Sequence, residues 1–165
     1  MADTPTVKVR RVRPDDAGGI ANFLAQATRG RLVVPYETVV ERLGGKAFFV
    51  AIADQIVGIA GWRVENLVAR IEDVVIHPSS LRAAAGRALF DTIEKEARQL
   101  ECEVMLLFVP TSASAAAVTF YQSLGFQRRL LQDVPPPWQQ AAEEFTSPGH
   151  FVMAKQLREL VMKPI

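Results

Sequence analysis

The chain has 165 residues and a formal net charge of +1, with 49% hydrophobic and 22% charged residues. This length suits one domain with a single core, and the composition is that of a globular protein. The near-neutral charge gives no electrostatic argument for binding nucleic acid or an anionic membrane, and no apolar segment approaches the ~20 residues of a membrane-spanning helix.

Residues 1–6 lack the basic and apolar regions of a signal peptide, so we expect a cytoplasmic protein with a single domain over residues 1–165. The only cysteine, Cys102, enters an apolar segment and is interpreted as a small buried hydrophobe. The only histidines, His77 and His150, are too far apart in the sequence to suggest a metal site. No metal is therefore expected.

In the first half of the chain, strand-like and helix-like hydrophobic patterns alternate. Gly58 and Gly61, inside an apolar strand, indicate a bulge or a close approach of neighbouring groups, and Trp62 is interpreted as a packing residue. The pattern predicts a strand over 7–12, helices over 14–27 and 36–43, and strands over 47–52 and 56–64.

The centre of the chain has a strand, a short loop and a helix. After a turn at 65–67, β-branched residues predict a strand over 71–77 that ends at Pro78, which cannot donate to a sheet. From Leu81 to Leu100, apolar residues recur at helical spacing. The start of this helix presents main-chain N–H groups and a positive dipole end, which favour an anion.

Three further elements are expected after this helix. An apolar strand over 104–109 precedes a helix that Ser112 or Ser114 can cap and that Gly125 ends. Strands over 127–131 and 150–157 come last.

The connection Gln132–Gly149 is longer than an ordinary hairpin. Pro135–Pro137 favours an extended polyproline conformation that would project Trp138 outward, while Glu143 and Glu144 offer negative charge to a cationic ligand. One interpretation places this connection over the binding site of such a ligand, where it helps to select the ligand. A dimer contact or a mobile surface loop explains its length equally well.

The segment Ile71–Leu89 resembles the central motif of the GNAT N-acyltransferase superfamily, in which a strand ending in V-x-P precedes a helix that opens with [Q/R]-x-x-G-x-[G/A]. Without gaps, the helical half of the motif falls on Leu81–Gly86. Leu81 stands where the family has Gln or Arg and Ala84 where it has Gly, whereas Gly86 agrees. The strand sequence I-E-D-V-V is very similar to that of glucosamine-phosphate N-acetyltransferases.

A second resemblance covers Ala117–Phe126, which matches the last GNAT motif. Tyr121 occupies the position of a tyrosine that the family often uses as a general acid. Ser114 stands where the family commonly has Asn. Helical spacing by itself explains Phe120 without any function.

The resemblance implies an α/β fold of GNAT type, with a mixed, twisted sheet of about 6–7 strands and helices on both faces. It also implies acetyl-CoA or another acyl-CoA as co-substrate and a small-molecule or peptide amine as acceptor, and it leaves a homodimer open. By resemblance, the coenzyme contacts are Val74, Val75, Ile76, Leu81, Arg82, Ala83, Ala84, Ala85, Gly86, Arg87 and Ser114.

Transfer of an acyl group to an amine needs a base, because an alkyl amine is mostly protonated at neutral pH. Glu72 and Asp73 lie on opposite faces of the strand, and the resemblance favours Glu72, acting directly or through water. Tyr121 would return a proton to the departing thiolate. The alternative is a degenerate GNAT domain that binds acyl-CoA weakly or not at all, with a regulatory or assembly role.

Overall fold

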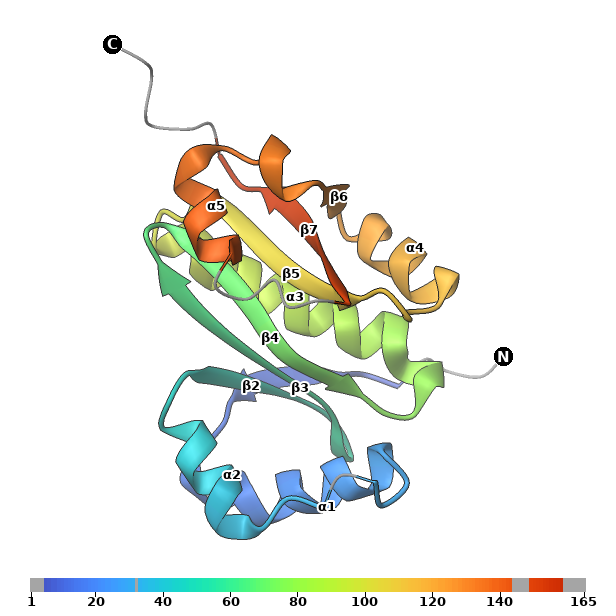
Figure 1. The fold of residues 1–165 in the computed structure, drawn as a ribbon. Helices are drawn as coiled ribbons and strands as arrows, with labels where there is room; N and C mark the ends of the chain where they lie inside the picture. The colour runs from blue at the N-terminus through green and yellow to red at the C-terminus, as the bar shows by residue number, and fades with distance from the viewer. Residues whose placement is uncertain (1–4, 32, 144–148, 159–165) are drawn as a thin grey trace. The chain divides into compact units, whose positions relative to one another are not determined.

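The computed structural model describes residues 5–31, 33–143 and 149–158. Its seven strands form one mixed sheet in the order β1-β2-β3-β4-β5-β7-β6, which confirms the predicted α/β sheet (Figure 1). The strands are β1 Lys8–Arg11, β2 Ala47–Ala53, β3 Gln55–Glu65, β4 Val68–Ile76, β5 Val104–Pro110, β6 Gln127–Arg129 and β7 His150–Gln156. The α-helices are α1 Ala17–Ala27, α2 Tyr36–Leu43, α3 Arg82–Gln99, α4 Ala115–Ser123 and α5 Pro136–Glu143.

The chain divides into two compact units, one formed by residues 1–62 and 73–93 and the other by residues 63–72 and 94–165. The strands β3 and β4 and the helix α3 each contribute residues to both units. The expectation of a single domain over 1–165 stays a prediction.

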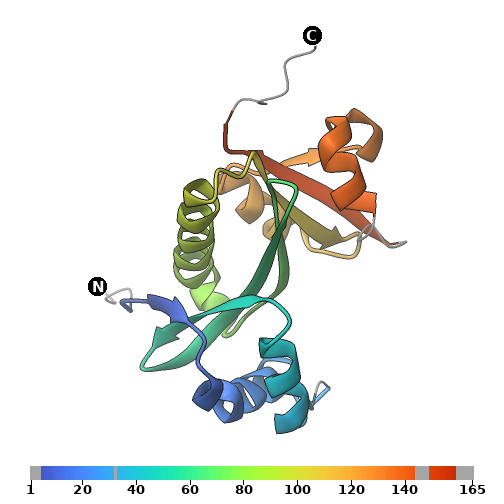
Figure 2. The same cartoon turned by 90° about the vertical axis from the view of Figure 1, so that its left-hand side faces the viewer.

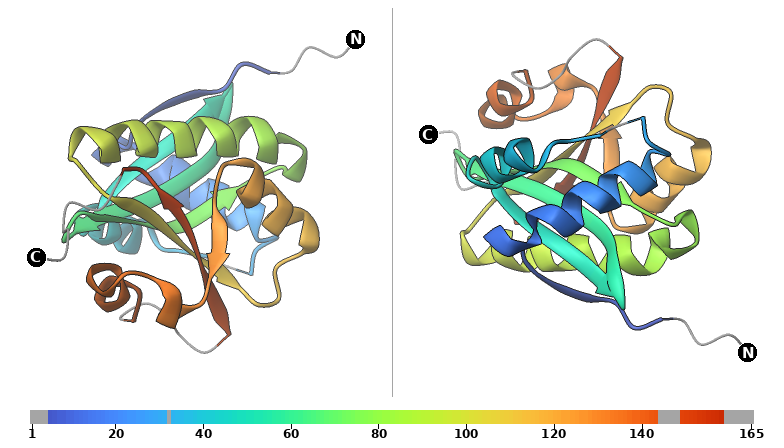
Figure 3. Two further views of the ribbon diagram at one scale, coloured as in Figure 1. Left: turned by 90° about the horizontal axis from the view of Figure 1, so that it is seen from above. Right: turned by 90° about the horizontal axis from the view of Figure 1, so that it is seen from below.

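In the first unit, α1 and α2 cover one face of β2 and β3, and the first half of α3 lies on the other face (Figures 2 and 3). Alternation along β3 explains this arrangement, because Ile59 packs with the α1–α2 side while a Cβ added at Gly58 would lie 3.1 Å from Leu89 of α3. A Cβ at Gly61 would lie 2.7 Å from the Phe48 ring. Both glycines therefore permit the predicted close approach, and the β2–β3 register shifts opposite Gly58.

The second unit has its own core, in which α5 packs on one face of β4, β5 and β7. The buried side chains of this core are Val68, Val104, Leu106, Val134, Trp138, Val152 and Ala154. Trp138 belongs to α5 and is 5% exposed, and its indole Nε1–H donates to Glu103 Oε2 at 3.0 Å. This bond satisfies two polar groups that burial would otherwise leave without partners.

The structure shows that two expectations for residues 132–149 are wrong. Pro135–Pro137 does not form a polyproline segment, because α5 begins at Pro136. A proline is tolerated at the first position of a helix, where the main-chain N–H would have no partner within the helix. Trp138 points into the core and not outward, because burying its large ring outweighs the local preference of the prolines. Glu143 ends α5, and Glu144 lies outside the described residues.

Several local signals in the sequence are confirmed. Ser114 caps α4, with its Oγ accepting from the Ala117 N–H at 3.1 Å, and Gly125 follows the helix with a φ of 99°. The tight β3–β4 turn places Asn66 and Leu67 at φ values of 52° and 64°. Cys102 is buried, and burial raises the pKa of its thiol.

In the part of the chain that the structure describes, no helix combines the length and apolar character needed to cross a membrane.

Candidate active site

Strand β4 changes its conformation between the two acidic residues. Asp73 has a φ of 55°, a left-handed conformation that interrupts the regular alternation of the strand. Glu72 faces Arg63 and Arg70, while Asp73 forms an ion pair with Lys46 at 2.8 Å. The two carboxylates therefore have separate surroundings.

Glu72 is held by arginines. Its Oε2 lies 3.9 Å from Arg63 Nε and its Oε1 lies 4.0 Å from Arg70 Nε, and its side chain is 13% exposed. Arg70 is 1% exposed and also lies 3.4 Å from Glu65. At these separations the two arginine Nε atoms act on the Glu72 carboxylate as nearby positive charges and not as hydrogen-bond donors to it.

Sequence reasoning missed Arg70. The signal was present, because residues two apart on a strand share a face, so Arg70 and Glu72 were bound to be neighbours. What the sequence did not reveal is that this face is buried at Arg70.

The parallel ladder between β4 and β5 runs from Val68↔Val104 to Ile71↔Leu107. Both strands extend further, β4 to Ile76 and β5 to Pro110. Among these described residues, the main-chain groups beyond the last pair are therefore not used by this ladder. Val74, Val75 and Ile76, which were predicted to contact a coenzyme, all lie in this extension of β4.

The start of α3 differs in detail from the predicted anion site. A 3-10 turn over Ser79–Leu81 precedes the helix, in which the Leu81 N–H donates to Pro78 O at 3.0 Å and the Arg82 N–H donates to Ser79 O. The donors of Leu81 and Arg82 are therefore already bonded within the turn.

The side chains at this helix start still suit a diphosphate. Ala83 and Ala84 are small and accessible, whereas Ala85 and Gly86 are buried against the protein. Among the described residues, no hydrogen bond or ion pair engages the guanidinium of Arg82 or Arg87. The small side chains of Ala83 and Ala84 and the positive charges of Arg82 and Arg87 are compatible with an anion at the start of this helix.

The remaining two predicted residues are Tyr121, in helix α4, and Ser114, the cap of that helix. Tyr121 is half-buried, and its ring centroid lies 5.9 Å from that of Phe120. Ser114 uses its oxygen as the helix cap, so the residue in the family's Asn position has a structural role here. Its hydroxyl hydrogen remains a donor.

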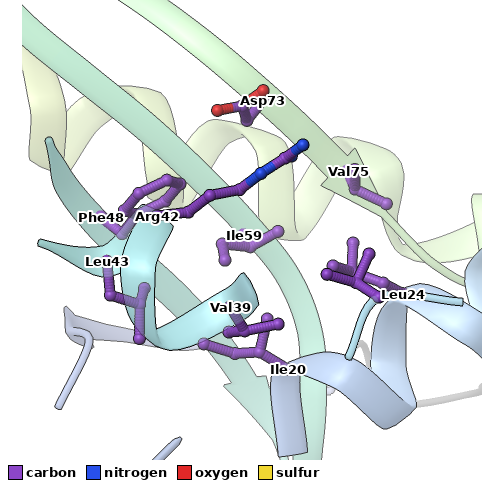
Figure 4. A pocket seen from close by; sticks show the side chains of 10 residues that line it. Ile20, Leu24, Val39, Arg42, Leu43, Phe48, Ile59, Asp73 and Val75 are labelled. Carbon is purple, nitrogen blue, oxygen red and sulfur yellow. The ribbon is translucent and has the colours of Figure 1, made fainter. Parts of the chain in front are cut away.

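A cavity of about 100 Å³ lies within the first unit, and we call it the α1–α2 cavity (Figure 4). Two polar residues, Arg42 and Asp73, stand beside its apolar walls. Its apolar lining residues are Ile20, Leu24, Val34, Val39, Leu43, Phe48, Ile59 and Val75. The cavity could not be predicted from the sequence, because residues from two helices, three strands and the connection that carries Val34 meet there only in the folded chain.

Among the described residues, no group of three or more His, Cys, Asp or Glu side chains could hold a metal ion.

Comparison with known proteins identifies the family of the chain and solved structures with the same fold. A model of the acetyltransferase (GNAT) domain matches residues 19–133. No curated protein matches the chain. Many solved structures share the fold.

One of them is a GNAT-family acetyltransferase from Staphylococcus aureus Mu50, with a TM-score of 0.71 and 16% identity, covering 92% of this chain and 99% of that one. Salmonella typhimurium yncA with its cofactor acetyl-CoA has a TM-score of 0.67 and 18% identity, covering 95% and 97%. The ribosomal-protein-S18-alanine N-acetyltransferase of Escherichia coli has a TM-score of 0.67 and 18% identity, covering 93% and 96%.

Proposed function

Because the chain belongs to the GNAT acetyltransferase family, we propose that it transfers an acetyl group from acetyl-CoA to a primary amine. The observation that carries this proposal is the family match over residues 19–133, which includes Glu72, the start of α3 and Tyr121. Acetyl-CoA, when bound, supplies the activated acetyl group as a thioester. The comparisons favour this enzyme over a degenerate domain, whereas a cytoplasmic location and a homodimer stay predictions.

Glu72 is the proposed base. Its carboxylate accepts a proton from the amine, directly or through one water, so that the nitrogen lone pair becomes available for attack on the acetyl carbon. The ion pairs with Arg63 and Arg70 place the Glu72 carboxylate beside two cations. The same two arginines repel a protonated amine, which favours the route through water.

Tyr121 is the proposed acid. Its hydroxyl donates a proton to the sulfur that leaves when the new C–N bond forms and the C–S bond breaks. Conversion of a protonated amine into an amide removes two protons from the nitrogen and adds one to the sulfur, so one proton passes to solvent in each turnover. Glu72 and Tyr121 return to their starting protonation states by exchange with solvent.

The coenzyme is held by main-chain groups and by positive charge in this proposal. The extension of β4 beyond its ladder with β5 leaves main-chain groups of Val74–Ile76 for hydrogen bonds. At the start of α3, Arg82 and Arg87 bind the pyrophosphate, and the small Ala83 and Ala84 leave space for it.

Titration calorimetry tests coenzyme binding. We expect CoA and acetyl-CoA to bind the wild-type protein, and the double variant Arg82→Gln/Arg87→Gln to bind them about 10-fold more weakly, since charge-assisted hydrogen bonds to phosphate are lost. Arg129→Gln, which removes an exposed charge from β6, is the control. Wild-type protein that releases no heat with millimolar coenzyme would refute the proposed function.

The role of Glu72 is tested through the rate of the reaction. Glu72→Gln is expected to lower kcat by ~10²–10⁴-fold, because an amide cannot accept the proton of the amine. Asp91→Asn, at an exposed carboxylate of α3, should keep the wild-type kcat. A wild-type kcat in Glu72→Gln would assign the base to another group.

A further inference from the structure

We propose that the α1–α2 cavity binds the acceptor, and that this acceptor is a small amine with a branched aliphatic group and a carboxylate, as in a branched-chain α-amino acid. The inference rests on the proposed acetyl transfer and specifies its acceptor. It follows from the size of the cavity, the charge at its rim and the strand that forms part of its wall.

The size and lining select the aliphatic group. The cavity measures about 100 Å³, and every wall residue except Arg42 and Asp73 is apolar. An apolar cavity of ~150 Å³ holds a benzene ring, so this one fits a smaller group such as the side chain of valine or leucine. Burial of such a group removes its apolar surface from water, which favours binding.

The charge at the rim selects the carboxylate. Asp73 already has a cation, because its carboxylate pairs with Lys46 at 2.8 Å. Arg42 is exposed, and among the described residues no hydrogen bond or ion pair engages its guanidinium. Figure 4 shows Arg42 extending from α2 toward the strand that carries Asp73 and Val75. The rim therefore has one uncompensated positive charge. The guanidinium of Arg42 can donate two parallel hydrogen bonds to a carboxylate.

The position of the cavity on β4 connects it with the reaction. Val75 lines the cavity, and the main-chain groups of Val74–Ile76 are those proposed to hold the coenzyme. A neutral alkyl amine would leave Arg42 without an anion. The first residue of a peptide would do so as well, because its carboxyl group is an amide. A free amino acid provides the aliphatic group, the carboxylate and the amine together.

Binding is measured first with matched ligands. L-Leucine and 3-methylbutylamine share the branched aliphatic group and the amine, and only leucine has the carboxylate. We expect leucine to bind the protein saturated with CoA more tightly than 3-methylbutylamine and than glycine, which has no side chain. Equal affinity for all three ligands, or no binding of leucine, would overturn the inference.

Variants then locate the binding. Arg42→Gln is expected to weaken leucine binding by ~10- to 100-fold and to leave 3-methylbutylamine unchanged, because only the bonds to the carboxylate are lost. Arg29→Gln removes an exposed charge from the connection between α1 and α2 and should change neither ligand. Equal losses in Arg42→Gln and Arg29→Gln would indicate general electrostatic attraction and contradict the specific contact.

Leu24→Ala tests the aliphatic wall through a change in preference. Enlarging the cavity should shift the preference from leucine toward phenylalanine, an outcome that simple destabilisation cannot produce. Thermal unfolding of each variant verifies that it is folded, and an unchanged ratio of leucine to phenylalanine affinity in folded Leu24→Ala would overturn the assignment.

The outcomes separate this inference from the proposed function. If CoA binds and leucine does not, the acetyltransferase stands and the acceptor is wrong. If CoA fails to bind, the proposed function is refuted, and leucine binding to the protein alone then decides whether the cavity recognises amino acids.

Discussion

Replacing Tyr121 with phenylalanine is expected to lower kcat by ~10²–10⁴-fold while changing the KM for acetyl-CoA much less. A general acid acts when the C–S bond breaks, so its loss raises the energy of the transition state and leaves coenzyme binding in place. Steady-state kinetics with saturating acceptor provides both constants.

The chain contains a matched control for this change. Its other tyrosine, Tyr36, is exposed on α2, and Tyr36→Phe removes the same hydroxyl without affecting the reaction. If Tyr121→Phe turned over at the wild-type rate, the proton would reach the sulfur from another donor, and Tyr121 would be a packing residue against Phe120.

Replacing Trp138 with alanine is expected to destabilise the protein by about 3–5 kcal/mol. The indole fills the core of the second unit between α5 and the sheet, and its removal leaves a large cavity. It also leaves the buried Glu103 without the indole donor. Urea unfolding followed by circular dichroism gives the free energy of unfolding.

Trp138→Phe separates the two contributions. It keeps most of the apolar ring and loses the hydrogen bond to Glu103, so we expect an intermediate loss of about 1–3 kcal/mol. A Trp138→Ala variant as stable as the wild type would contradict the packing of α5. The same packing implies that replacing residues 133–148 with a short turn would remove Val134 and Trp138 from the core, so such a variant does not test acceptor selection alone.

The sequence by itself determined the elements that depend on local physics. The period of apolar residues located most strands and helices within a few residues, and Tyr36–Leu43 was located without error. Ser114 and Gly125 marked the two ends of α4, because a cap and a left-handed stop are local properties of the chain. The strand that carries Glu72 pointed to the family that the comparison later found.

Only the tertiary structure decided the features that join distant residues. Trp138 was expected outside because its neighbours are prolines, yet the unfilled space over β4, β5 and β7 draws it into the core. Arg42 and Asp73 are 31 positions apart, and nothing in their local sequence indicates that they border one cavity. The Leu81 and Arg82 donors are a local exception, because a 3-10 turn after Pro78 already uses them. For Trp138 and for the cavity, the deciding contacts join residues that are far apart in the sequence, and hydrophobic periodicity does not indicate such contacts.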